Sequence, residues 1–326
     1  MSIYGRSRVK VPASTANLGP GFDTLGMALS LYAWIEMEEA AETVLHLYGD
    51  EMAGLPRDKS NLLYKVAQMV FAEAGVHIPE LSISMYSEIP LTRGLGSSAS
   101  AIIGALAAAN AMIGSPLSPS KLFDMATAIE KHPDNVGASL FGGIITAVWD
   151  GEHADYIRIE PPQELEFLVV IPEFELETVK AREALPAEVT VSDAVHNISH
   201  TSLLTAALAA GRLDMLGTAM QDRLHQPYRA ALVPGMEKLL AEAPDHGALG
   251  IALSGAGPTL LCMVDRKEAR KQELEQFLTR TMQEHGIPSR TVWLSPCTAG
   301  VTTELLERSG MSNGTFLDMI KGELHS

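Results

Sequence analysis

The sequence predicts an α+β protein built from two domains, and three observations support this. Strand-like and amphipathic helical patterns occur together in each half of the chain. Glycine-rich turns stand beside predicted strands in both halves, and a polar, proline-bearing patch over 150–164 separates the halves. We therefore expect one domain over 1–160, a second over 161–300, and a polar tail over 301–326 for which the pattern indicates no partner.

The first half begins with strands around a glycine-rich turn. The helix over 61–74 has an apolar stripe on one side and Gly75 as its stop signal. In chain order we expect strands over 9–11 and 35–37, a helix over 61–74, a strand over 81–86, a helix of small residues over 101–109, a helix over 118–131 and a buried strand over 143–148.

The second half repeats the mixture of strands and helices, again around a glycine-rich loop. The last helix carries charged residues along one face. We expect a strand over 167–171, helices over 199–210, 213–224 and 234–243, strands over 250–253 and 259–264, and a helix over 267–285.

Composition narrows the class of protein. The 326 residues are 46% hydrophobic and 20% charged, which is ordinary for a globular protein, and the net charge of −16 disfavours a nucleic-acid binder. Cys262 and Cys297 have no metal-ligand spacing and are too few for a disulfide framework. The start of the chain has no apolar core of a signal peptide, and no segment approaches the roughly 18 apolar residues of a membrane span. We therefore expect a cytoplasmic protein without membrane or nucleic-acid partners.

The run P-L-T-R-G-L-G-S-S-A-S at 90–100 is the strongest indication of function. Gly94 and Gly96 permit backbone conformations that residues with a Cβ avoid, and they let a ligand approach the main chain. Ser97 and Ser98 are good N-cap residues, and the helix they begin would direct free N–H groups and a partial positive charge at the loop. We expect a phosphate site here, with the hydroxyls in reach of a magnesium ion.

Other interpretations of this run remain open. A glycine pair before a helix is often only a turn, and 94–99 also match the G-x-G-x-x-A pattern of dinucleotide-binding folds. That fold needs its first glycine directly after the strand and an acidic residue ending a strand roughly 20 residues on. Here 88–93 intervene, and 118–124 begin a helix instead. The chain has no G-x-x-x-x-G-K-[ST] motif, so it is not a P-loop nucleotide hydrolase.

Two short segments concentrate polar side chains. In the segment over 12–23, Asn17 and Asp23 flank a Gly-Pro-Gly turn, so both either face one hollow or merely stabilise the turn. The sequence E-K-H-P-D-N at 130–135 is either a solvated helix end or part of a site. In the second case Glu130 suits a Mg²⁺ ion, which prefers few carboxylates together with phosphate oxygens.

A second glycine-rich loop and two arginines complete the set of candidates. The run L-S-G-A-G-P-T at 253–259 is either a hairpin-like turn or the other side of one cleft. Arg182 and Arg229 stand in a chain with few basic residues, and the arginine fork fits a carboxylate in bidentate fashion. Most single arginines are simply exposed, so their chemistry alone leaves that role open.

Together these segments resemble the GHMP kinases, a superfamily of small-molecule kinases. The three glycine-bearing segments occur in that superfamily's order, and P-x-x-x-G-L-G-S-S-A is a highly specific signature. Within the superfamily the chain looks like the homoserine kinases. Four motifs favour that family: S-T-A-N-L-G-P-G-F-D at 14–23, H-P-D-N at 132–135, T-x-x-x-R at 178–182 and H-Q-P-Y-R at 225–229. The likeness extends to about residue 300.

The resemblance implies both a fold and an activity. The fold has a ribosomal-protein-like N-terminal domain with a left-handed βαβ crossover, an exception to the usual handedness, and a ferredoxin-like C-terminal domain. The implied activity is ATP-dependent phosphorylation of L-homoserine to O-phospho-L-homoserine for threonine synthesis, with Mg²⁺ as cofactor. The family also implies a homodimer.

The resemblance further implies roles for single residues. The ATP phosphates would bind Pro90, Leu91, Thr92, Arg93, Gly94, Leu95, Gly96, Ser97, Ser98, Ala99 and Ser100, with Asn61 suggested as an adenine contact. Ser98 and Glu130 would bind Mg²⁺. The homoserine site would contain Asn17, Asp23, His132, Asn135, Thr178, Arg182, Arg229 and Gly255, where Arg182 and Arg229 clamp the carboxylate and Asp23 is the candidate for the ammonium group.

The same resemblance suggests a mechanism without a dedicated catalytic aspartate. Asn135 would orient the hydroxyl, and whether Asp134, Asp23 or no residue takes the proton stays open. One departure concerns the segment before H-P-D-N, where several relatives have two acidic residues and a glycine, whereas this chain has Glu130 and Lys131. Two alternatives to a homoserine kinase remain, a mevalonate-type kinase and a ligand sensor without turnover.

Overall fold

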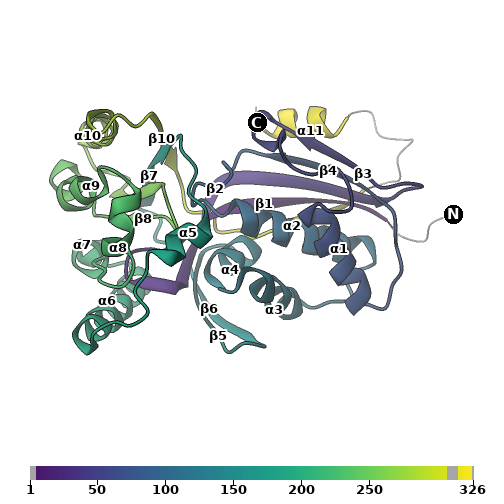
Figure 1. The fold of residues 1–326 in the computed structure, drawn as a ribbon, viewed down its shortest axis with the longest axis horizontal. Helices are drawn as coiled ribbons and strands as arrows, with labels where there is room; N and C mark the ends of the chain where they lie inside the picture. Colours follow the sequence, from purple (N-terminus) through teal and green to yellow (C-terminus); the bar gives the residue numbers. More distant parts are fainter. Residues whose placement is uncertain (1–4, 307–314, 325–326) are drawn as a thin grey trace.

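The computed structural model describes residues 5–306 and 315–324. Within these residues a seven-stranded and a four-stranded sheet lie side by side along the long axis of the molecule, and helices pack on both (Figure 1). The α+β class predicted from the sequence is confirmed. The change from one sheet to the other falls between Ile159 and Leu165. This supports a domain boundary near residue 160, and the division into domains itself stays a prediction.

The larger sheet is built around two long neighbouring strands. Its order is β11-β1-β2-β4-β3, and β5 pairs with the start of β2 and with β6. β3 and β4 are parallel and are connected through helix α1, as a βαβ crossover requires. The strands are β1 (Arg6–Asn17), β2 (Gly21–Glu39), β3 (Val44–Tyr48), β4 (Leu81–Ser87), β5 (Ile144–Trp149), β6 (Ala154–Ile159) and β11 (Thr302–Leu306).

Four helices lie on one side of the larger sheet (Figure 1). Helix α2 consists mostly of small residues (Ala, Ser and Gly) and lies close to β1 and β2: a Cβ on Gly104 would stand only 2.4 Å from Cδ1 of Ile35. Small side chains therefore bring the start of α2 close to the strands that carry the N-terminal turn. The helices are α1 (Leu62–Glu73), α2 (Ser97–Met112), α3 (Pro119–Glu130) and α4 (Asp134–Phe141).

The smaller sheet is antiparallel, with the order β10-β7-β9-β8. Alternate residues of β7 face two cores: Leu168 packs in a core with α9 and α10, and Val169 packs in the core shared with the larger sheet. The elements are β7 (Leu165–Pro172), α5 (Thr178–Glu183), α6 (Val191–Ala210), α7 (Leu216–Ala219), α8 (Gln226–Arg229), α9 (Met236–Glu242), β8 (Gly250–Leu253), β9 (Leu260–Asp265), α10 (Lys271–Glu284) and β10 (Ser289–Leu294), with 3₁₀ turns at 50–52, 213–215, 230–232 and 243–246.

The chain after residue 300 has partners that the sequence did not indicate. β11 pairs antiparallel with β1, and helix α11 (Phe316–Leu324) buries Phe316 and Ile320 against Trp34. Trp34 lies on the face of β2 opposite Ile35, so α11 covers the side of the sheet away from α2 (Figure 1). The expectation of a tail without partners is therefore wrong for these residues. The part of the tail over 307–314 lies outside the described residues.

Several elements differ in length from the predictions, and β2, α6 and the helix predicted over 213–224 are among them. β2 extends over 19 residues, although the local pattern predicted only residues 35–37 near its end. α6 begins at Val191, upstream of the predicted start at 199, because Thr190 caps it by accepting a hydrogen bond from the amide of Asp193. The predicted helix over 213–224 stops at Ala219, since the side chain of Asp222 accepts the next amide hydrogen bonds in place of helical carbonyls.

Candidate active site

A cavity between the two sheets collects most of the residues expected at the site. Its wall is formed by the β1–β2 turn, the loop before α2, the α3–α4 connection, α5, α8 and the β8–β9 loop. The expected residues that line it are Asn17, Asp23, Thr92, Gly94, Gly96, Ser97, Ser98, Ala99, Glu130, His132, Asp134, Asn135, Thr178, Arg182, Arg229 and Gly255. Motifs that are far apart in the sequence thus meet in one place.

The other expected residues do not belong to this wall; they are Pro90, Leu91, Arg93, Leu95, Ser100 and Asn61. Asn61 is the N-cap of α1: its Oδ1 accepts a hydrogen bond from the amide of Leu63, and its Nδ2 donates to the carbonyl of Pro56. Arg93 donates to the carbonyls of Leu91, Pro172 and Glu173. These side chains hold the loop and helix in place, and the geometry gives no support to an adenine contact by Asn61.

The glycine-rich loop leaves space next to the start of α2. Gly94 and Gly96 have φ of 78° and 73°, and a Cβ on Gly96 would lie 2.1 Å from Oγ of Ser14. Gly96 is the N-cap of α2 and makes no side-chain cap, so the expectation that Ser97 or Ser98 caps this helix is wrong. The first hydrogen bond within the helix runs from the amide of Ser100 to the carbonyl of Gly96. The amides of residues 97–99 therefore take no part in the helical hydrogen bonds. These amides and the helix dipole suit an anion.

Ser98 and Glu130 come from different helices and meet at the cavity. The hydroxyl of Ser98 donates a hydrogen bond to Oε1 of Glu130, which ends α3. Lys131 follows with φ of 72°, in the left-handed region that favours glycine. A glycine would adopt this conformation without strain. The strained lysine nevertheless keeps the turn that directs Glu130 towards Ser98.

His132 and Asp134 form a buried pair in the α3–α4 connection. Nδ1 of His132 lies 2.6 Å from Oδ1 of Asp134, which also accepts the amide of Asn135. Burial alone would lower the pKa of His132, but the charge and hydrogen bond of Asp134 outweigh it and, with smaller contributions from Asp23 and Glu130, raise the pKa to about 9. The imidazole is therefore charged at neutral pH.

The same pair bears on metal binding. Asp23, His132 and Asp134 offer ligand atoms within 4.8 Å of one another among the described residues. A metal-bound histidine must be neutral, whereas the raised pKa of His132 favours its protonated form. The oxygen pair of Ser98 and Glu130 is therefore the better fit for a hard divalent cation.

Asn135 is oriented by a buried serine on strand β1. Oγ of Ser14, on β1, donates to Oδ1 of Asn135 over 3.0 Å, and Ser14 also contacts the hydroxyl of Ser139. With Oδ1 occupied, the amide nitrogen of Asn135 is the end that remains to face a ligand. In this orientation Asn135 acts as a hydrogen-bond donor.

Two arginines from the second half of the chain line the cavity, and only one of them is paired with a carboxylate. Arg182 makes a bidentate ion pair with Asp23. Arg229 is 1% exposed and has no carboxylate within ion-pair distance among the described residues. Burial, together with the charge of Arg182, lowers the pKa of Arg229 to about 10, so the guanidinium stays charged at neutral pH. A buried cation without a carboxylate is costly in isolation, so an anion bound in the cavity would stabilise it.

Among the residues not singled out from the sequence are Phe22, which lines the cavity, and Ser254, which is fully buried. The ring of Phe22 lies close to both guanidinium groups, with its centroid 5.5 Å from Cζ of Arg182 and 5.3 Å from Cζ of Arg229. The hydroxyl of Ser254 contacts Thr15 at 2.8 Å and the carbonyl of Gly94 at 2.6 Å, joining both glycine-rich loops. Both residues lie inside motifs that pointed to the site. A phenylalanine and a serine are common residue types, so nothing in the sequence distinguished these two from their neighbours.

Two family models match the chain. The model of the GHMP kinases N terminal domain matches residues 61–143, and that of the GHMP kinases C terminal matches residues 204–283. The first contains the glycine-rich loop and the α3–α4 connection, and the second contains Arg229 and the β8–β9 loop. Fold and site together define a kinase of the GHMP class.

Relatives narrow the family further. A homoserine kinase from Moorella thermoacetica is 42% identical over 292 residues, which cover 90% of this chain and 98% of that protein. A homoserine kinase from Deinococcus radiodurans is 43% identical over 296 residues, with 91% and 96% covered. The crystal structure of homoserine kinase from Cytophaga hutchinsonii has a TM-score of 0.83 at 26% identity and covers 93% of this chain and 99% of that chain. This chain belongs to the homoserine kinase family.

More distant structures share the fold alone. A mevalonate kinase structure has a TM-score of 0.64 at 17% identity. In the described part of the chain, no helix is both long enough and apolar enough to cross a membrane.

Proposed function

We propose that this protein transfers the γ-phosphate of ATP to the side-chain hydroxyl of L-homoserine, forming O-phospho-L-homoserine and ADP in threonine synthesis. The curated relatives at about 42% identity support this activity. One structural observation carries the substrate assignment: Arg229 is a buried cation without a carboxylate partner in the described residues, and it faces the same cavity as the start of α2. A carboxylate-bearing substrate would satisfy that charge.

The charges around the cavity fit an amino acid. Arg229 and Arg182 are the donors for the substrate carboxylate, while Asp23 is the acceptor for its ammonium group. Mevalonate has a carboxylate but no ammonium group, so Asp23 would have no cationic partner on that substrate. The combination therefore favours homoserine over a hydroxy acid.

The other end of the cavity suits a nucleoside triphosphate. The amides of 97–99 and the α2 dipole are positioned for phosphate oxygens, and the glycines keep side chains away from them. Ser98 and Glu130 would hold a Mg²⁺ ion through their oxygens, and the bound ion would neutralise phosphate charge. We propose that these two residues and the loop 92–99 form the ATP phosphate site.

The protein would accelerate the reaction mainly by positioning the two substrates, and not through covalent chemistry of its own. Phosphoryl transfer passes through a loose transition state, in which the attacking hydroxyl has to lie in line with the leaving oxygen. The amide nitrogen of Asn135 can hold that hydroxyl, since Ser14 fixes its orientation. Oδ1 of Asp134 is already engaged, because it lies 2.6 Å from Nδ1 of His132 and accepts a hydrogen bond from the backbone amide of Asn135. The arrangement therefore favours transfer without a dedicated aspartate base.

A coupled assay of ADP release tests this function. With Mg-ATP we expect turnover of L-homoserine and at most weak turnover of mevalonate or L-threonine. Turnover of mevalonate alone would replace homoserine as the substrate. Binding of homoserine and ATP without any ADP release would indicate a sensor of the same fold. We further propose a cytoplasmic homodimer with domains over 1–160 and 161–300, which sedimentation and limited proteolysis would test.

A further inference from the structure

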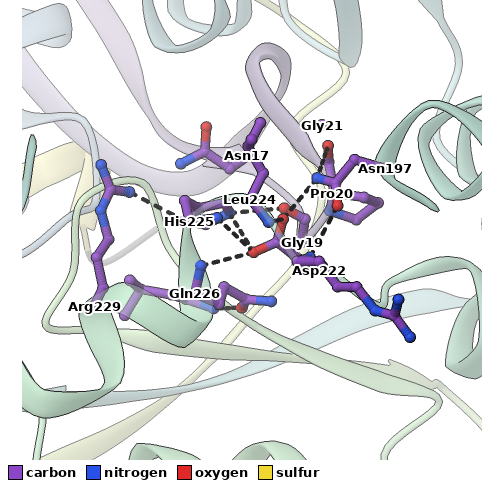
Figure 2. A network of polar contacts seen from close by, with 12 residues as sticks. Asn17, Gly19, Pro20, Gly21, Asn197, Asp222, Leu224, His225, Gln226 and Arg229 are labelled. Carbon is purple, nitrogen blue, oxygen red and sulfur yellow. Dashed lines mark hydrogen bonds and ion pairs between the residues drawn. The ribbon is translucent and has the colours of Figure 1, made fainter. Parts of the chain in front are cut away.

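Asp222 organises the start of the helix that carries Arg229. Its side chain is fully buried and accepts hydrogen bonds from Nδ2 of Asn197 at 2.7 Å and from the amides of Leu224, His225 and Gln226 at 2.9, 3.0 and 2.6 Å (Figure 2). Four donors thus converge on one carboxylate. This arrangement fixes the turn before α8 and the direction in which His225 and Arg229 project.

His225 connects this turn with the N-terminal domain. Its Nε2 lies 2.7 Å from the carbonyl oxygen of Gly19, in the β1–β2 turn between Asn17 and Asp23 (Figure 2). Its Nδ1 lies 3.2 Å from Nη1 of Arg229. The ring also stacks on Phe22, with centroids 5.3 Å apart. The imidazole therefore bridges the substrate-side turn of one domain and the buried arginine of the other.

The partners of His225 determine its protonation. A carbonyl oxygen only accepts, so Nε2 carries a proton; a guanidinium only donates, so Nδ1 has none. Both contacts are satisfied at once only by the neutral ring with its proton on Nε2. Burial lowers the pKa of His225, in agreement with a neutral ring, even though Oδ2 of Asp222 lies 3.6 Å from Nε2.

Three of the N–H donors of Arg229 are held by the protein. Nε donates to the carbonyl of Ala181 at 3.0 Å, and Nη1 donates to His225 and to the carbonyl of Gly255 at 3.1 Å. Asn17 donates to the same carbonyl of Gly255 from the N-terminal domain at 2.9 Å. Nη2 makes no hydrogen bond within the described residues, so it is the donor left for a ligand. The guanidinium is fixed on one side and available on the other.

We propose that His225 is a positioning residue for substrate recognition: by accepting from Nη1 while donating to Gly19, it sets the guanidinium of Arg229 against the substrate carboxylate. This inference rests on the proposed function, because it needs a carboxylate-bearing substrate in the cavity. It assigns a role to the first residue of H-Q-P-Y-R, in which only the arginine had one. His225 acts through Arg229 and makes no contact with the reacting atoms.

A pair of substitutions separates the two hydrogen bonds. His225→Asn keeps an acceptor near the position of Nδ1 and loses the donor to Gly19, whereas His225→Gln keeps a donor near the position of Nε2 and loses the acceptor for Arg229. We expect H225Q to raise the KM for homoserine about tenfold or more, because it removes a hydrogen bond to a charged group, and to leave the KM for ATP within about twofold. H225N should raise the KM for homoserine clearly less.

A substrate analogue tests whether the carboxylate contact is the one affected. In 2-aminobutane-1,4-diol a hydroxymethyl group replaces the carboxylate of homoserine. H225Q should reduce the preference for homoserine over this analogue in kcat/KM, since only homoserine uses Arg229. Equal losses for homoserine, the analogue and ATP in both variants would give His225 a purely structural role and overturn the proposal.

Nuclear magnetic resonance of the unmodified protein, labelled with ¹⁵N-histidine, gives a readout that does not depend on the variants folding. At neutral pH the ring of His225 should carry its proton on Nε2 alone. A doubly protonated ring, or a proton on Nδ1, would overturn the proposal. If the unmodified protein did not phosphorylate homoserine, the proposed function would fail instead, and the tautomer would still report on the geometry.

Discussion

Arg182 and Asp23 pair with each other across the cavity, with Nη1 3.0 Å from Oδ2 and Nη2 2.7 Å from Oδ1. Arg182 stands on α5 and Asp23 on β2, so the pair joins the two halves of the chain. The side chains are 38% and 32% exposed, so the pair contributes little stability by itself. The groups expected to bind the carboxylate and the ammonium group of an amino acid satisfy one another here, and a bound substrate would exchange or share these contacts.

This relationship predicts that each partner matters for the amino-acid substrate more than for ATP. We expect Arg182→Ala to raise the KM for homoserine about tenfold or more, because a charge-assisted donor to the carboxylate is lost, and to leave the KM for ATP nearly unchanged. Asp23→Asn should act similarly by removing the negative charge for the ammonium group. Steady-state kinetics with either substrate varied would measure both effects.

Arg182→Lys is the matched control, because it keeps the positive charge and loses the planar fork. It should fall between the unmodified protein and the alanine variant. The unfolding free energy of all three variants should change by less than about 1 kcal/mol, as expected for a partly exposed pair. An equal rise of both KM values would contradict the assignment of Arg182 and Asp23 to the amino-acid site.

A second prediction concerns the contact between Ser98 and Glu130. If their oxygens hold Mg²⁺, Ser98→Ala and Glu130→Gln should each lower kcat about tenfold or more and raise the Mg²⁺ concentration needed for half-maximal activity. Titration of MgCl₂ at fixed ATP and homoserine would measure this. Ser120→Ala, at an exposed position on α3, should change neither quantity. An unaltered magnesium dependence in both site variants would remove the metal assignment.

The phosphate loop was predictable from the sequence because its chemistry is local. Glycines at 94 and 96, hydroxyls at 97 and 98 and a following helix describe an anion site without any long-range contact. The position of the cap was not predictable at the same level. Gly96 takes the left-handed conformation at the N-cap, where Ser14 from β1 leaves no space for a side chain, and that neighbour is distant in sequence.

Features that depend on contacts between distant parts of the chain could not be predicted from the sequence. β11 exists because Thr302 and its neighbours pair with β1, which stands nearly the whole chain length away. The residues at 225 and 19 offered no local pattern that would link them, although both lie in motifs that pointed to the site. Residue chemistry thus located the site, and tertiary contacts determined how the groups within it are paired.

A third prediction tests the close packing of the glycine-rich loop. Gly96→Ala would place a Cβ 2.1 Å from Oγ of Ser14 at a residue with φ of 73°, so both the backbone and the neighbour would have to shift. We expect a loss of about 2–4 kcal/mol in unfolding free energy and a large loss of kcat, since Ser14 also orients Asn135. Urea denaturation and the ADP assay would measure the two effects.

Gly75→Ala separates backbone strain from crowding. Gly75 has φ of 67° but open space around its Cβ position, so its substitution should cost only about 1 kcal/mol and leave kcat unchanged. If the two variants lost equal stability and kept equal activity, the contact between the glycine-rich loop and β1 would not constrain the site.

A fourth prediction concerns helix α11, which covers the face of the sheet away from the cavity. Phe316 is 5% exposed and stacks on Tyr48, and Ile320 packs in the same cluster with Trp34. Phe316→Ala should lower the unfolding free energy by about 2–4 kcal/mol, because it leaves a void in this cluster. Both KM values should stay unchanged, since α11 contributes no residue to the cavity. Lys321→Ala, at an exposed position of the same helix, should leave stability within about 0.5 kcal/mol. Unchanged stability of the Phe316 variant in thermal and urea denaturation would mean that α11 does not hold this face of the sheet in solution.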